Sequence, residues 1–75
     1  MDERAVREYL IEHDERFRQL LNEHQQFERK LAEFIEKPFL STDEQLEETV
    51  IKKKKLALKD QMQRLITQHR SLSVQ

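Results

Sequence analysis

Hydrophobic side chains recur along the first half of the chain at alternating spacings of four and three residues. The positions between them are mostly charged or polar. This spacing places the hydrophobic side chains along one side of an α-helix, as in the seam where two helices pack lengthwise. The stripe consists of Val6, Leu10, His13, Phe17, Leu20, His24, Phe27, Leu31 and Phe34. It predicts one long helix over about residues 3–36.

A second helix is predicted over about residues 43–70, after a connection over about residues 37–42. Pro38 lacks a backbone N–H and disfavours a helical conformation in the residue before it, so the first helix should end there. Residues 71–75 are expected to form a frayed tail. The stripe of the second helix supplies further core side chains at Ile51, Leu58, Met62 and Leu65.

Two residues are suited to cap the start of the second helix. Ser41 is followed three positions later by Glu44, and Thr42 is followed three positions later by Gln45. Either pair fits a capping box, in which each side chain accepts a hydrogen bond from the other residue's backbone N–H. The sequence leaves both alternatives open.

The short connection should bring the two helices together as an antiparallel hairpin. An exchange of helices between two chains would give the same pattern, but Pro38 and the capping residues favour a turn. Further hydrophobic residues lie beside the stripes and widen the apolar surface beyond what one partner helix covers. We expect Leu21, Ile35, Leu56 and Ile66 to contact a second chain or another protein. The predicted fold is therefore an all-α domain over residues 1–75, a coiled-coil-like two-helix hairpin that self-associates. A dimer forming a four-helix bundle is the simplest such homo-oligomer.

The composition narrows the range of functions. The chain has 75 residues, 39% of them charged, with no glycine and no cysteine. Disulfides and thiolate metal sites are excluded, and a sheet with tight turns is hard to build without glycine. No apolar run approaches the roughly 20 residues that span a bilayer, and no signal peptide is evident. We expect a cytoplasmic protein that does not contact a membrane.

The three histidines do not predict a metal site. His13 and His24 are eleven residues apart on one helix, whereas two ligands on one helix need a spacing of three or four. His69 could approach His13 in a hairpin, but no third ligand is evident. We expect polar interruptions of the core that fix its register. With no phosphate loop or nucleophile motif either, we predict no cofactor and no enzymatic activity.

Residues 52–55 are four consecutive lysines. Successive helical residues turn by about 100°, so these side chains surround the helix rather than form one patch. An alternative function is an anion-binding or nucleic-acid-binding regulator that uses Lys52, Lys53, Lys54, Lys59 and Arg64. No aromatic residue is interleaved for base stacking, and no DNA-binding motif accompanies the lysines. Nucleic acid is therefore not the expected partner.

Three segments resemble the YdcH-like family of small, mostly bacterial helical proteins. They are Glu12-His13-Asp14-Glu15-Arg16-Phe17, Leu21-Asn22-Glu23-His24 and the lysine run that continues into Leu56-Ala57-Leu58-Lys59-Asp60. The resemblance implies a short helical hairpin or coiled coil and no established activity. Lys59 and Asp60 are either functional residues or a structural ion pair with the first helix, and we favour the structural alternative. The function we predict is a non-enzymatic structural or protein-interaction module that acts through coiled-coil packing.

Overall fold

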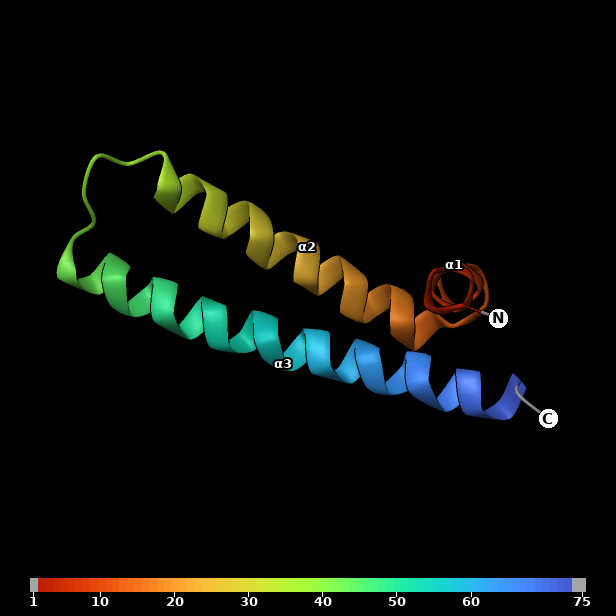
Figure 1. Ribbon diagram of the computed structural model, residues 1–75. Coiled ribbons are helices and arrows are strands. Elements are labelled where there is room, and N and C mark those ends of the chain that lie inside the picture. Colours follow the sequence, from red (N-terminus) through yellow and green to blue (C-terminus); the bar gives the residue numbers. More distant parts are fainter. Residues whose placement is uncertain (1, 74–75) are drawn as a thin grey trace.

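The computed structural model describes residues 2–73, which form three helices and no strand (Figure 1). The helices are α1 (Glu3–His13), α2 (Glu15–Ile35) and α3 (Thr42–Ser73). Helices α2 and α3 lie side by side and run in opposite directions, whereas α1 crosses them steeply at the far end from their connection (Figure 1). The predicted all-α fold is confirmed. No described helix combines the length and the apolar character needed to cross a bilayer.

The prediction of one continuous helix over residues 3–36 is wrong, because the chain breaks at Asp14. Asp14 has an extended backbone, with φ −119° and ψ 108°. Its backbone N–H donates to the Leu10 carbonyl at 2.8 Å, and its Oδ1 accepts from the Phe17 N–H at 2.9 Å. Aspartate favours this role because its short carboxylate satisfies the free N–H groups at a helix start. One residue therefore ends α1 and caps α2.

The break allows α1 to fold back onto the other two helices. Seven buried side chains from all three helices form one hydrophobic cluster, comprising Val6, Leu10, Phe17, Leu20, Leu58, Met62 and Ile66. Phe34 and Ile51 are also buried, nearer the connection. Among the other predicted core residues, His24, Phe27, Leu31 and Leu65 are half-buried. His13 is not in the core, since its side chain is 56% exposed at the end of α1.

The connection leaves the Phe39 side chain in solvent, and its last residue, Ser41, caps the start of α3. Phe39 is 84% exposed, so it does not fold back against the core. Ser41 Oγ accepts from the Glu44 N–H at 3.2 Å, while Glu44 Oε1 accepts from the Ser41 N–H at 3.1 Å. This reciprocal capping box fixes the start of α3. At the other end, α3 continues through residues 71–73, which were expected to fray, and residues 74–75 lie outside the described range.

Candidate functional site

One face of the α2–α3 pair is covered by α1 only at its far end. Leu21, Glu28 and Ile35 recur every seven residues along one side of α2, and Lys52, Lys59 and Ile66 do so along α3. A spacing of seven is close to two turns, so each set follows one line. Ile66 is 2% exposed and belongs to the cluster with Val6 and Leu10, and half-buried Leu21 packs against that cluster.

The predicted outer contact therefore divides into two parts. Ile66 is buried in the cluster that includes Val6 and Leu10 of α1, and Leu21 packs against that cluster and is half-buried, so neither is freely exposed to another chain. Ile35 and Leu56 remain 81% and 59% exposed. The continuous helix expected from the sequence would have left all four side chains uncovered. The break at Asp14 is the reason for the difference.

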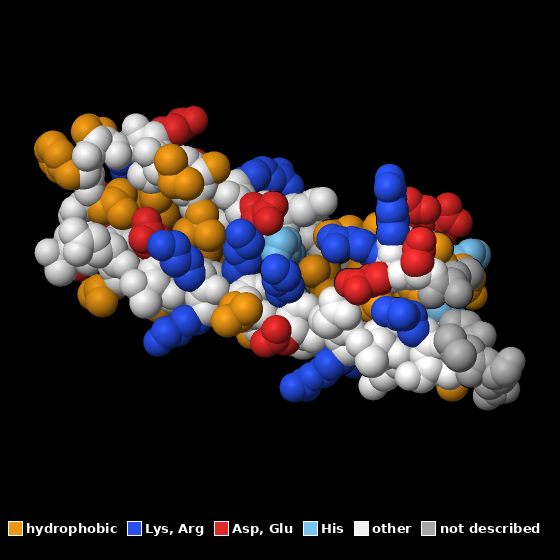
Figure 2. Space-filling model, viewed as in Figure 1, with side chains coloured by type: hydrophobic (Ala, Val, Ile, Leu, Met, Phe, Trp, Pro, Cys, Tyr) orange, Lys and Arg blue, Asp and Glu red, His pale blue; other side chains and the backbone are white. Residues whose placement is uncertain are grey.

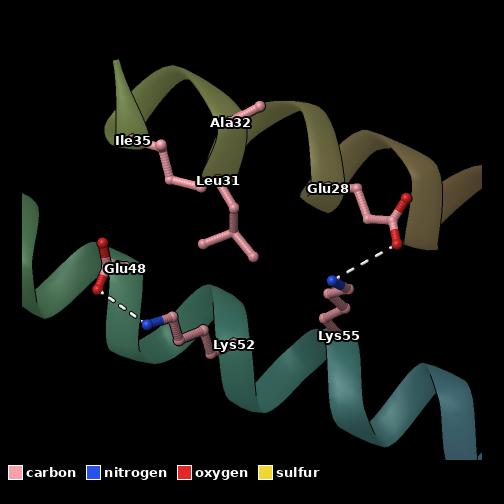
Figure 3. A pocket seen from close by; sticks show the side chains of 7 residues that line it. All are labelled: Glu28, Leu31, Ala32, Ile35, Glu48, Lys52 and Lys55. Atoms are coloured by element: carbon pink, nitrogen blue, oxygen red, sulfur yellow. Dashed lines mark hydrogen bonds and ion pairs between the residues drawn. The ribbon is translucent and has the colours of Figure 1, made fainter. Parts of the chain in front are cut away.

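A groove lies between α2 and α3 at the uncovered end. It has a volume of about 340 Å³, and an adjoining hollow of about 290 Å³ extends it along α3. Figure 3 shows Leu31 projecting from α2 toward α3, with Ala32 and Ile35 on the same helix. The residues that line the groove and the hollow are Glu28, Leu31, Ala32, Ile35, Glu48, Lys52, Lys55, Leu56 and Lys59.

Lysines border the α3 side of the groove. Lys55 Nζ lies 3.5 Å from Glu28 Oε1 across the groove, and Lys52 Nζ lies 3.1 Å from Glu48 Oε1 on α3 (Figure 3). Exposed pairs of this kind contribute about 0–1 kcal/mol each, so they order the side chains more than they stabilise the fold. No carboxylate in the described part of the chain lies within ion-pair distance of Lys59. Figure 2 shows the resulting border of basic side chains beside the hydrophobic surface near the connection.

The structure does not bring the five candidate anion-binding residues onto one surface. Lys52 and Lys59 line the groove, whereas Arg64 lines a separate hollow with Arg16 and Gln61. The other two, Lys53 and Lys54, are exposed at further positions around α3. The helical rotation that distributes the lysines also prevents them from forming one basic patch.

The expected ion pairs between the first helix and the end of the lysine segment are not formed. Lys59 and Asp60 are exposed, and no ion pair involves either of them in the part of the chain that is described. Lys55 makes the contact to α2 instead, through Glu28. Lys55 lies four residues after Ile51 and three before Leu58, on the same side of α3 as these buried side chains, and it is the lysine that reaches across the groove.

An aromatic residue joins two of the histidines at the end of the molecule where α1 lies. The Tyr9 ring is centred 4.3 Å from the ring of His13 and 4.7 Å from that of His69. The sequence allowed His69 to approach His13 in a hairpin, but it gave no sign that Tyr9 would contact both rings. In the described range no group of three His, Cys, Asp or Glu residues is placed to hold a metal ion. The stacked rings therefore dock α1 against α3.

The pKa of the Glu44 carboxylate is well below its ordinary value. A hydrogen bond from the Lys37 side chain, followed by one from the Ser41 backbone, lowers the pKa of Glu44 from 4.5 to about 2. Both interactions favour the ionised carboxylate. The Lys37–Glu44 contact joins the beginning of the connection to the first turn of α3, while the Ser41–Glu44 contact is part of the capping box. This is a structural role.

The fold is that of a small all-helical protein with a groove between two of its helices. The chain belongs to the family described as protein of unknown function (DUF465), whose match covers residues 17–66. The matched segment contains both walls of the groove and begins after the break at Asp14, so α1 lies outside it. Neither the curated proteins nor the solved structures include a match to this chain.

Proposed function

We propose that this protein is a non-enzymatic interaction module that binds an amphipathic helix of a partner protein in the groove between α2 and α3. The observation that carries the proposal is that α1 covers only one end of the face formed by α2 and α3. Helix α1 packs over one end of it, whereas Ile35 and Leu56 at the other end stay 81% and 59% exposed. An uncovered apolar surface rimmed by charge is characteristic of a protein-binding site.

Helix α1 indicates what kind of segment suits this face. It contributes Val6 and Leu10, which are four residues apart and so lie on the same side of a helix. A partner helix with apolar side chains at the same spacing would place them against Leu31, Ile35 and Leu56, in the manner of other helix-in-groove complexes.

The charge at the rim favours an acidic partner. Lys52, Lys55 and Lys59 line the groove and its extension, with Glu28 and Glu48 as the acidic lining residues. Carboxylates along the margin of a partner helix would meet this excess of positive charge, which guides encounter and orientation more than it adds affinity. The Leu56-Ala57-Leu58-Lys59-Asp60 motif lies along the same part of α3, and its resemblance to the YdcH-like proteins supports a shared use of this segment.

The test uses two synthetic amphipathic helices with identical apolar stripes. One carries glutamates along both margins and the other carries lysines, and binding is measured by isothermal titration calorimetry. We expect the acidic peptide to bind and the basic peptide to bind at least about tenfold more weakly, a difference of about 1.4 kcal/mol. Equal binding of the two, or binding of neither, would overturn the proposal.

Substitutions in the chain locate the binding site. Ile35→Glu with Leu56→Glu should remove binding of the acidic peptide, because both side chains would lose their apolar contact area. The matched control is Gln26→Glu with Gln68→Glu, which adds the same two charges at exposed positions outside the groove. Circular dichroism establishes that all variants keep their helices. Binding that survives the first pair of changes would show that the peptide does not occupy the groove.

A further inference from the structure

A second hydrophobic strip follows the outer side of α3. Leu46 and Val50 are 63% and 48% exposed, and Ala57 is exposed as well. Together with Lys53 they recur at spacings of four, three and four, so they lie along one side of the helix. Ile51 and Leu58 occupy the buried side that faces α2. The outer strip therefore points away from α2, and the groove does not include Leu46, Val50 or Ala57.

The charges beside this strip change sign at its centre. Residues 43–48 carry four acidic side chains and no basic one, and residues 52–59 carry five basic side chains and no acidic one. If two copies of α3 packed in the same direction, the strip would place acidic segments beside acidic ones and lysines beside lysines. In opposite directions, the acidic segment of each copy lies along the basic segment of the other.

The side chains of the strip fit one antiparallel register. When Leu46 faces Ala57 of a second copy, Val50 faces Lys53 of that copy, because both pairs are centred between Ile51 and Lys52. A large side chain then meets a small one, and the aliphatic stem of Lys53 can lie along Val50 with its ammonium group in water. The same register brings Glu47 near Lys54 of the second copy. By two-fold symmetry each of these contacts is made twice.

From these observations we infer that a second copy of this chain packs on the outer strip of α3 in the antiparallel direction. The contact uses the side of α3 that is opposite α2, so each copy keeps its groove open. The dimer would thus carry two grooves for partner helices. This inference goes beyond the proposed function and does not depend on it.

Disulfide trapping tests the register directly, since the chain has no cysteine of its own. Leu46→Cys and Ala57→Cys chains are oxidised separately and as a mixture. We expect a disulfide-linked dimer in the mixture only, because a disulfide requires Cα atoms within about 7 Å and the two Leu46 positions lie far apart in this register. Linkage of each variant to itself would indicate parallel packing and overturn the inference, as would no linkage in any sample.

Charge reversal supplies an independent readout, the molar mass in solution from light scattering. Glu47→Lys and Lys54→Glu should each weaken the dimer several-fold, and the double variant should restore it. Glu47 also lies 3.7 Å from Lys30 of its own chain, and the double variant still lacks this contact. Recovery can therefore come only from the pair between copies. A double variant that stays weak, or an unaltered chain that is monomeric at all concentrations, would refute the dimer. Acidic-peptide binding by that monomer would leave the proposed function standing.

Discussion

Asp14→Ala tests why the chain breaks between α1 and α2. The substitution removes the Asp14 carboxylate that accepts from the Phe17 N–H at 2.9 Å. Loss of such an N-cap costs about 1 kcal/mol, within a range of about 0.5–2. For a domain of this size, each 1 kcal/mol lowers the melting temperature by about 4–8 °C. We expect a decrease of that order.

Alanine also favours a helix that continues through position 14, and this effect opposes the break. The gain in helix propensity is at most about 0.7 kcal/mol. Straightening the chain would remove Val6 and Leu10, now 0% and 4% exposed, from the core. Their burial is worth about 1.5–3 kcal/mol each, which exceeds the gain. Helix α1 should therefore stay docked in Asp14→Ala, and only the cost of the missing cap should be measured.

Tyr9 makes the position of α1 measurable. It is the single tyrosine in a chain without tryptophan, and its ring stacks on His69 of α3. Its fluorescence and near-ultraviolet circular dichroism therefore report docking, while far-ultraviolet circular dichroism reports the melting temperature. Asp14→Asn serves as the control because asparagine caps helices about as well as aspartate. A rise in melting temperature for Asp14→Ala, together with loss of the native tyrosine signal, would show that the continuous helix is the more stable form.

Three further predictions use the same fold. Ile66→Ala should lower the free energy of unfolding in urea by about 2–5 kcal/mol, because Ile66 is 2% exposed. Ile35 is 81% exposed, so Ile35→Ala should change this free energy by less than about 0.5 kcal/mol. Similar losses at both sites would contradict the placement of α1. Because the pKa of Glu44 is about 2 in the folded chain and 4.5 ordinarily, its contribution to stability is present above pH 4.5 and is lost as the pH falls toward 2. Glu44→Gln should flatten the pH dependence of urea unfolding in that window, and an unchanged slope would exclude this role. The basic side chains of residues 52–54 point in different directions around α3, so the chain should not be retained on immobilised RNA at physiological salt. Retention that is lost when these three residues are changed to glutamine would show that they bind RNA.

The two long helical segments could be predicted because their signals are local and agree with one another. The stripe that includes Phe17, Leu20 and Phe34 has one period throughout, and each of these side chains is buried. Pro38 and the Ser41–Glu44 capping box mark the connection with residues whose effects operate within one turn of helix. Interactions within a few residues can be read from sequence.

The break at Asp14 could not be read in the same way. The hydrophobic stripe passes through His13 and Phe17 without a change of period, so it fits a straight helix and a broken one equally well. The choice depends on the burial of Val6 and Leu10 against Ile66, which is distant in the sequence. The aspartate at position 14, a preferred N-cap residue, was the signal that could have indicated the break.

The extent of the exposed groove also depends on whether the first helix is continuous or broken at Asp14. Ile35 and Leu56 were expected to meet a partner together with Leu21 and Ile66, and nothing local distinguishes the two pairs. Only the position of α1 makes Ile66 part of the core and leaves Ile35 in solvent. Sequence reasoning therefore identified hydrophobic positions beside the two stripes but could not determine which of them the fold leaves exposed.

The stacking of Tyr9 on His69 also has a consequence for how the chain is made. Helices α2 and α3 meet across a short connection, so their first contacts need little loop closure. Helix α1 leaves the ribosome before both of them, yet its docking site is completed only by the last turns of α3. Until those turns are synthesised, Val6 and Leu10 remain exposed on a short helix that is marginal by itself. Helix α1 is therefore the first of the three helices to be synthesised and the last to pack.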